Sequence, residues 1–150
     1  MKIIAFWVLL GLGACADAPE RIRQHTYPQD FRYYQEGEIE GVMHQLAIEL
    51  SALDEIMRKE PRTAGDQAEI VAILTRMRGF SRELTRVPHS NHPRIDRYAP
   101  VLQRDLERAL HDARRDPPNY YFAGEVAGSC SYCHVPRHDL PAPQPDASGL

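Results

Sequence analysis

The fold class is indicated most clearly by residues 36–60, EGEIEGVMHQLAIELSALDEIMRKE. The apolar residues of this stretch recur at alternating spacings of four and three: Ile39, Met43, Leu46, Leu50, Leu53 and Met57. This period places them along one face of an α-helix, and an apolar face of this kind packs against a partner helix. The stretch therefore predicts an amphipathic helix, which we expect to end where Pro61 and Gly65 follow.

Three further segments have the same helical period, at about residues 66–87, 93–115 and 119–134. Prolines and polar turn residues separate the segments, so each connection is short. Asp66, followed three residues later by Glu69, predicts an N-cap for the second segment. Four helices with short connections and no strand pattern predict an all-α fold, and more specifically an antiparallel four-helix bundle in up-down-up-down order.

The chain of 150 residues is long enough for one domain of ordinary size, and we assign that domain to residues 36–134. Residues 1–14 are typical of a signal peptide, because Lys2 precedes an apolar run that is too short to span a bilayer. We expect residues 15–35 to form a polar tether. The Pro-rich residues 135–150 are expected to form a flexible tail.

The signal peptide ends in LGAC, residues 12–15, which resembles the lipobox of bacterial lipoproteins. The resemblance implies that Cys15 carries lipid and becomes the first residue of the mature chain. It also accounts for the odd number of cysteines in an exported protein, since only Cys130 and Cys133 then remain. The alternative is an ordinary secretory signal that is cleaved near Ala16.

The net charge argues against one class of partner. The formal charge is -3, and removal of the signal peptide takes away Lys2 but no acid, which gives -4. A mildly acidic chain without a basic stripe binds nucleic acid poorly. We therefore expect no nucleic-acid partner.

The chemistry of the chain is concentrated in SCSYCHVP, residues 129–136, which contains the C-x-x-C-H motif of Cys130, Cys133 and His134. This motif is a signal for covalent attachment of c-type haem. Two thiols at positions i and i+3 share a helix face and can add to the two vinyl groups of haem, and His134 can turn its imidazole to the iron. Two alternatives stay open: a redox dithiol, which normally opens a helix after a strand, and a structural zinc site, which needs four ligands.

Small residues precede the motif: Ala123, Gly124, Ala127 and Gly128. Glycine is unfavourable inside a helix unless another group must come close to the backbone. We expect these residues to lie against the flat macrocycle, which favours haem over the two alternatives.

A four-helix bundle with C-x-x-C-H at the end of its last helix resembles the class II cytochromes c, the family of cytochrome c′ and its low-spin relatives. The resemblance covers about residues 30–138, and VAGSCSYCH, residues 126–134, is its most specific part. It implies one covalent haem c, thioether links to both motif cysteines, and His134 as an axial ligand. Relatives often have Arg or Lys shortly after the motif His, whereas Arg137 is offset here. Relatives also often dimerise through their first two helices, which implies a homodimer.

The sixth position on the iron decides the function. In an up-down-up-down bundle the start of the first helix lies level with the end of the last, so Met43 lies level with the motif and on the inward face. Low-spin class II relatives use a Met early in the first helix as an axial ligand, whereas cytochrome c′ has an apolar residue there. Met43 is therefore the candidate sixth ligand. Met57, about 21 Å further along at 1.5 Å per residue, and Met77 are expected in the core.

Three histidines are alternatives to Met43. His44 is rotated by about 100° from Met43, off the inward face. Together with a nearby Arg, however, it could serve a peroxidase, so that function stays an alternative. His89 and His92 lie in a connection at the same end of the bundle, and either could reach the iron or a propionate.

Four arginines are expected at the end of the bundle that carries the motif, where they could pair with the propionates: Arg32, Arg86, Arg94 and Arg97.

These observations predict an electron carrier rather than an enzyme. It would be lipid-anchored on the periplasmic side of a bacterial membrane, with His134 and Met43 as the axial ligands. Its partners would be the membrane, through lipid on Cys15, and redox proteins of the cell envelope. The alternative is a five-coordinate haem protein like cytochrome c′, which binds nitric oxide or other small gases while Met43 only packs over the open position.

Overall fold

The computed structural model describes residues 27–28, 30–35 and 37–134. The predicted signal peptide, the lipid attachment at Cys15 and the tail at 135–150 fall outside the described residues. The chain divides into two compact units, residues 1–31 and 32–150, and the described part of the second is called the helical unit here. Of the described residues, 71% are helical and few are in strands, so the prediction of an all-α fold is confirmed.

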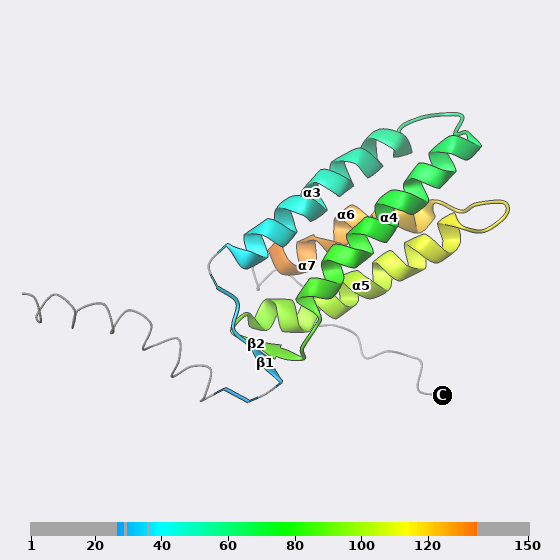
Figure 1. Cartoon of the computed structure of the whole chain (residues 1–150). Coiled ribbons are helices and arrows are strands. Elements are labelled where there is room, and N and C mark those ends of the chain that lie inside the picture. The colour runs from blue at the N-terminus through cyan, green and yellow to red at the C-terminus, as the bar shows by residue number, and fades with distance from the viewer. Residues whose placement is uncertain (1–26, 29, 36, 135–150) are drawn as a thin grey trace, which may run out of the picture. The chain divides into compact units, whose positions relative to one another are not determined.

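Five helices are present among the described residues (Figure 1). They are α3 Glu38–Met57, α4 Ala64–Leu84, α5 Pro93–Ala113, α6 Tyr121–Ser129 and the single turn α7 Ser131–His134. The two short strands β1 Phe31–Arg32 and β2 His89–Ser90 form a small sheet. The helices match the four segments with helical period, but their ends differ from the predicted ends by up to three residues.

The start of α4 corrects one prediction. Thr63, not Asp66, is the N-cap residue: its hydroxyl accepts from the Asp66 N–H, and the Asp66 carboxylate accepts from the Thr63 N–H in return. This reciprocal arrangement is a capping box, with the acidic residue at the third helical position. Gly65 therefore lies in the first turn of α4 rather than in the connection before it.

The last predicted helix is interrupted at Cys130. The Cys130 N–H donates to the Ala127 carbonyl and the Cys133 N–H donates to the Cys130 carbonyl, both at 3.3 Å. These bonds span three residues, so the helix tightens there, as helix ends often do. The motif residues Cys133 and His134 thus lie in a separate turn, α7.

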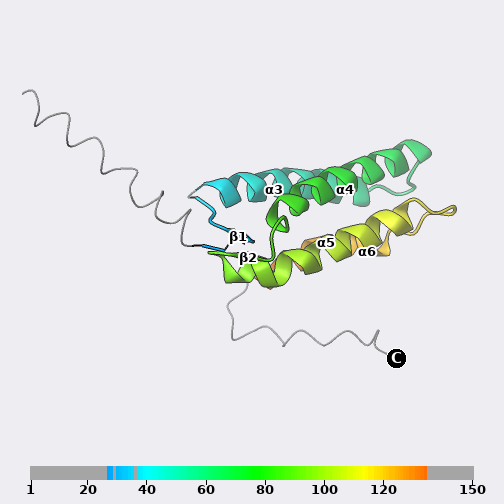
Figure 2. The same cartoon turned by 60° about the horizontal axis from the view of Figure 1, so that its bottom comes forward.

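Helices that follow one another in the chain lie side by side, and α3 also contacts α6 (Figures 1 and 2). Gln67, in the first turn of α4, donates to the carbonyl of Ala113 at the end of α5. The Met57 methyl, at the end of α3, lies 3.7 Å from where a Cβ on Gly124 of α6 would lie. In both pairs an end of one helix meets the start of the other, so these neighbours run in opposite directions.

The core lies between the helices and uses most of the predicted apolar positions. Leu46 and Leu53 of α3, together with Met77 of α4, are buried, as expected from the helical period. Four further apolar residues of the long helices are also buried: Ile56, Leu74, Ala99 and Leu110. Each long helix contacts two neighbours, so its buried face is wider than the stripe that a single partner would cover.

Residues 32–35, which we expected in the tether, are attached to the helical unit. The Tyr34 side chain is 4% exposed, and its hydroxyl donates to the carbonyls of Glu83 and Leu84 at 3.3 Å. The Tyr34 N–H donates to the Asn91 side-chain carbonyl at 2.8 Å, and the Asn91 amide donates back to the Tyr34 carbonyl at 3.0 Å. The chain therefore joins the helices at Arg32, before α3 begins.

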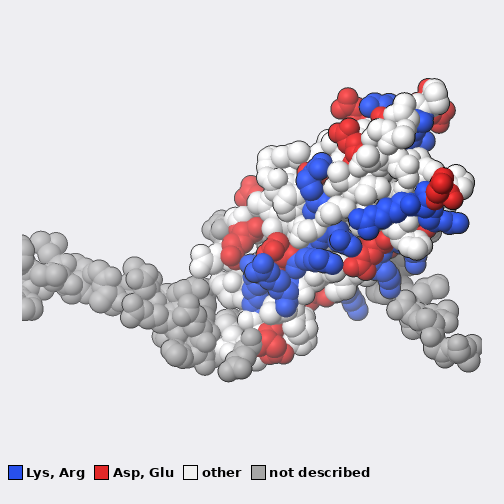
Figure 3. Space-filling model, turned by 45° about the vertical axis from the view of Figure 1, so that its right-hand side comes forward, with Lys and Arg blue, Asp and Glu red and all other residues white. Residues whose placement is uncertain are grey.

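The charges of the helical unit are unevenly distributed. The helix α3 carries five acidic residues and no Lys or Arg. On the face drawn in Figure 3, Lys and Arg side chains form a band with Asp and Glu side chains beside it.

No helix in the described part of the chain is both long and apolar enough to cross a membrane.

Candidate functional site

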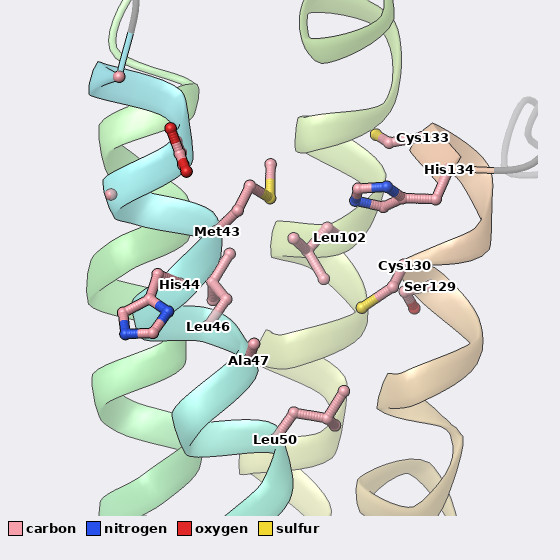
Figure 4. A pocket seen from close by; sticks show the side chains of 13 residues that line it. Met43, His44, Leu46, Ala47, Leu50, Leu102, Ser129, Cys130, Cys133 and His134 are labelled. Carbon is pink, nitrogen blue, oxygen red and sulfur yellow. The ribbon is translucent and has the colours of Figure 1, made fainter.

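A cavity of about 740 Å³ lies between α3 on one side and α6 and α7 on the other (Figure 4). Its walls are mostly apolar or small, and Leu102 of α5 also contributes. The lining residues on α3 and its N-cap are Gly37, Glu40, Gly41, Met43, His44, Leu46, Ala47 and Leu50, and those from the motif region are Ser129, Cys130, Cys133 and His134. The volume is within the range of about 300–1,000 Å³ that is usual for ligand and cofactor sites.

The first turns of α3 supply one wall. Gly37 precedes the helix with φ 89°, a left-handed conformation that glycine adopts without the penalty a Cβ would bring. Met43 is half-buried, and its side chain extends from α3 toward α7 (Figure 4). His44 is exposed and lies on the other side of α3 in this view, at the edge of the cavity.

The motif supplies the opposite wall. The His134 ring extends from α7 toward α3, and the Cys130 sulfur points into the cavity (Figure 4). Both cysteines are half-buried and neither is in a disulfide. The structure therefore brings Met43 and the three motif residues, which are far apart in the sequence, to a single cavity.

The surroundings of the two thiols keep them protonated. Burial raises the pKa of both Cys130 and Cys133, and at Cys133 the positive charge of Arg94 partly opposes the effect of burial. A reactive dithiol normally has at least one cysteine whose pKa is lowered by nearby positive charge or by a helix N-terminus. Both pKa values are therefore shifted in the direction opposite to the one that activates a redox dithiol.

The other candidate ligands and propionate partners lie elsewhere. His89 and His92 are exposed and do not line the cavity, and His92 packs edge-on against the Tyr34 ring. Among the predicted arginines, Arg32 pairs with Glu38 and Arg86 pairs with Glu83. Arg97 lies near the Tyr98 ring, and the positive charge of Arg94 acts on Cys133.

The small residues before the motif do not line the cavity, in contrast to the prediction. Ala123 is buried in the core, and Gly124 faces the Met57 methyl. Ala127 and Gly128 are exposed, and a Cβ on Gly124 would make only an ordinary van der Waals contact with that methyl at 3.7 Å, so the packing of α6 does not require glycine at position 124.

Two features of the site have no clear signal in the sequence. Leu102 of α5 packs against the core and also lines the cavity. Ser129 is 7% exposed, and its hydroxyl donates to the Asp105 carboxylate of α5 at 2.7 Å. A serine between a glycine and a cysteine carries no periodic signal, so only the spatial arrangement identifies this contact.

The residues present fit a covalently attached haem. Two thiols, one imidazole and one thioether sulfur line an otherwise mostly apolar cavity, and these groups can form two thioether links and two axial bonds. Within the described part of the chain, no cluster of three or more His, Cys, Asp or Glu side chains is arranged to hold a metal ion directly.

No protein family, curated protein or solved structure matches the chain.

Proposed function

We propose that the chain is a membrane-anchored c-type cytochrome that transfers electrons through a haem held by Cys130, Cys133, His134 and Met43. The observation that carries the proposal is the shared cavity, in which Met43 of α3 and the C-x-x-C-H motif occupy opposite walls. Side chains so distant in the sequence have no local reason to meet. A ligand that contacts both walls would explain why these side chains line the same cavity.

Each motif thiol would add across one vinyl group, so that a sulfur–carbon bond forms and the thiol hydrogen passes to the other vinyl carbon. His134 nitrogen and Met43 sulfur would then be the axial ligands, a pair that raises the haem potential and leaves no position for a substrate. When bound, the haem supplies an iron that accepts and returns one electron. The chain would act as an electron carrier and not as an enzyme.

The antiparallel contacts between neighbouring helices support an up-down-up-down four-helix bundle. Such a bundle, with the motif at the end of its last helix, is the architecture that the resemblance to class II cytochromes c implies. The resemblance also implies a homodimer. Lipid on Cys15 would hold the protein on the periplasmic side of a bacterial membrane, where redox proteins of the cell envelope would be its partners.

The visible spectrum of the purified full-length protein tests the proposal. We expect covalently bound haem after denaturation and extraction, and a low-spin spectrum in the reduced state that carbon monoxide does not change. A chain that carries no covalent haem would refute the proposal. A high-spin spectrum that shifts with carbon monoxide would instead identify the five-coordinate, gas-binding alternative, in which Met43 only packs over the iron.

A further inference from the structure

The helix α5 holds the motif turn through a partly buried hydrogen bond. The Ser129 hydroxyl donates to the Asp105 carboxylate at 2.7 Å, immediately before Cys130. Because Ser129 is almost fully buried, water competes little for this bond. A hydrogen bond to a charged acceptor is also stronger than one between neutral groups.

A second contact joins α5 to the same turn on the other side of Cys130. The Tyr132 ring stacks on the Tyr98 ring, with 6.1 Å between ring centroids and 15° between ring planes. Tyr98 and Asp105 are seven residues apart on α5, which places them on one face of that helix. The stack and the hydrogen bond therefore bind one face of α5 to both ends of the interrupted turn.

The two sets of residues alternate along the motif. Ser129 and Tyr132 are spaced i and i+3 and contact α5, whereas Cys130 and Cys133 have the same spacing and line the cavity. Each set occupies one face of the turn, rotated by about 100° from the other. Fixing the first face against α5 thus fixes the direction of the second.

We propose that Asp105 and Tyr98 of α5 are positioning residues, which hold Ser129 and Tyr132 and thereby aim Cys130, Cys133 and His134 into the cavity. The helix is interrupted at Cys130, so the backbone hydrogen bonds of a continuous helix do not hold this turn by themselves. Only the reason for directing these side chains into the cavity, which is to bind haem, rests on the proposed function. The contacts to α5 are themselves observed.

The main test compares Ser129→Ala and Asp105→Ala with the matched control Ser131→Ala. The Ser131 hydroxyl donates to the Gly128 carbonyl within the same turn and does not reach α5. Amide hydrogen exchange of residues 130–134 should become about tenfold faster in the first two variants, the size expected for a lost bond to a carboxylate. Exchange in the core of α4 should not change, which shows that each variant is folded.

The reduction midpoint potential of the haem-loaded protein separates positioning from general stability. We expect Ser129→Ala to shift the potential, and the double variant to match Asp105→Ala, because the serine has no partner once the Asp105 carboxylate and its charge are removed. Ser129→Thr, which retains the hydroxyl, should restore the wild-type value. Tyr132→Leu should also shift the potential, whereas Tyr121→Leu, a change at a residue that is 65% exposed, should not.

Equal behaviour of Ser129→Ala and Ser131→Ala in both measurements would overturn the inference. If the wild-type chain carries haem in that case, the proposed function still stands. A wild-type chain without haem would overturn the proposed function and the proposed role of these residues in directing haem ligands. Faster exchange in Ser129→Ala would in that case show only that the contact to α5 stabilises the turn.

Discussion

Met43 and His134 lie 91 residues apart in the sequence and on opposite walls of one cavity. The thioether of Met43 is unbranched and adaptable, so it can pack in a core or bind a metal without a change of backbone. Met57 has the same side chain and lies on the same helix, but it packs against Gly124 of α6. The surroundings, and not the residue type, distinguish the two methionines.

Replacement of Met43 by Ala should change the spin state of the haem. Without the sulfur the sixth position is open, so we expect a high-spin spectrum in the reduced state that shifts on addition of carbon monoxide. The midpoint potential should fall, because ligation by Met and His raises it. Visible spectra and redox titration measure both effects.

The matched control is Met57→Ala, which removes the same atoms farther along α3. It should lower the free energy of unfolding by about 1 kcal/mol, since Met57 is partly buried against the core, but the spectrum should stay that of the wild type. If Met43→Ala also kept the wild-type spectrum, Met43 would be a packing residue.

Replacement of Tyr34 by Phe tests how the N-terminal segment is held. The lost hydroxyl bonds to Glu83 and Leu84 should lower the free energy of unfolding by about 1 kcal/mol at neutral pH. Tyr121→Phe, at an exposed position, should have no measurable effect. Urea unfolding measures both variants, and equal midpoints would show that the hydroxyl of Tyr34 does not contribute.

The same tyrosine gives a prediction for alkaline pH. Burial raises the pKa of Tyr34 above its ordinary value of 10.0, so the folded state favours the protonated phenol. Its contribution is complete below about pH 10 and is lost as the pH rises through that value, because the unfolded chain releases the proton first. The urea midpoint of wild type should therefore fall more than that of Tyr34→Phe between about pH 8 and pH 11. Parallel decreases would contradict this.

At the scale of elements, the periodic apolar residues predicted four helical segments, but the ends of the helices depend on contacts that periodicity does not contain. The sequence predicts that Gly65 helps to end the first helix, but Gly65 lies in the first turn of α4, which the Thr63–Asp66 capping box stabilises. The interruption at Cys130 has no proline or glycine at that position, and it coincides with the contacts of its neighbours to α5. The sequence could therefore place the motif on the last helix, but not in a separate turn.

The capping box of α4 predicts a dependence on acid. Thr63→Ala should lower the free energy of unfolding by about 1 kcal/mol at neutral pH, and Asp66→Asn should also destabilise. Hydrogen bonds from Thr63, and then from Lys59, lower the pKa of Asp66 well below its ordinary value of 3.8. This contribution is present above the ordinary pKa and is lost as the pH falls toward the folded-state pKa.

The difference between wild type and Asp66→Asn should thus be constant near neutrality and shrink below about pH 4. The control is Asp54→Asn, which removes a carboxylate whose partner Arg58 is exposed at the C-cap of α3, and exposed pairs of this kind contribute little. Urea unfolding at several pH values measures all three proteins. A difference that persists unchanged in acid would exclude the carboxylate as its cause.

At the scale of the whole molecule, the order of the helices was enough to bring Met43 level with the motif, since neighbours joined by short connections run antiparallel. The cavity itself could not be predicted, because it depends on which side chains leave space between α3 and α6. The attachment of residues 32–35 was also missed: Tyr34 and Asn91 are 57 residues apart, and their paired hydrogen bonds have no periodic signal. Tyr34, which these bonds hold against the helical unit, is three residues before Gly37, which lines the cavity.

Removal of the proposed lipid site should separate anchoring from haem binding. We expect Cys15→Ser to move the protein from the membrane fraction to the soluble fraction, because the described helices include none that could span a bilayer. Its spectrum should equal that of the wild type, since residues 32–134 carry the whole cavity. Cys133→Ser is the control: it should stay with the membrane but lose one covalent link to haem. Fractionation with haem staining after denaturing electrophoresis measures both properties. A wild-type chain that is already soluble would instead indicate an ordinary signal peptide, cleaved near Ala16.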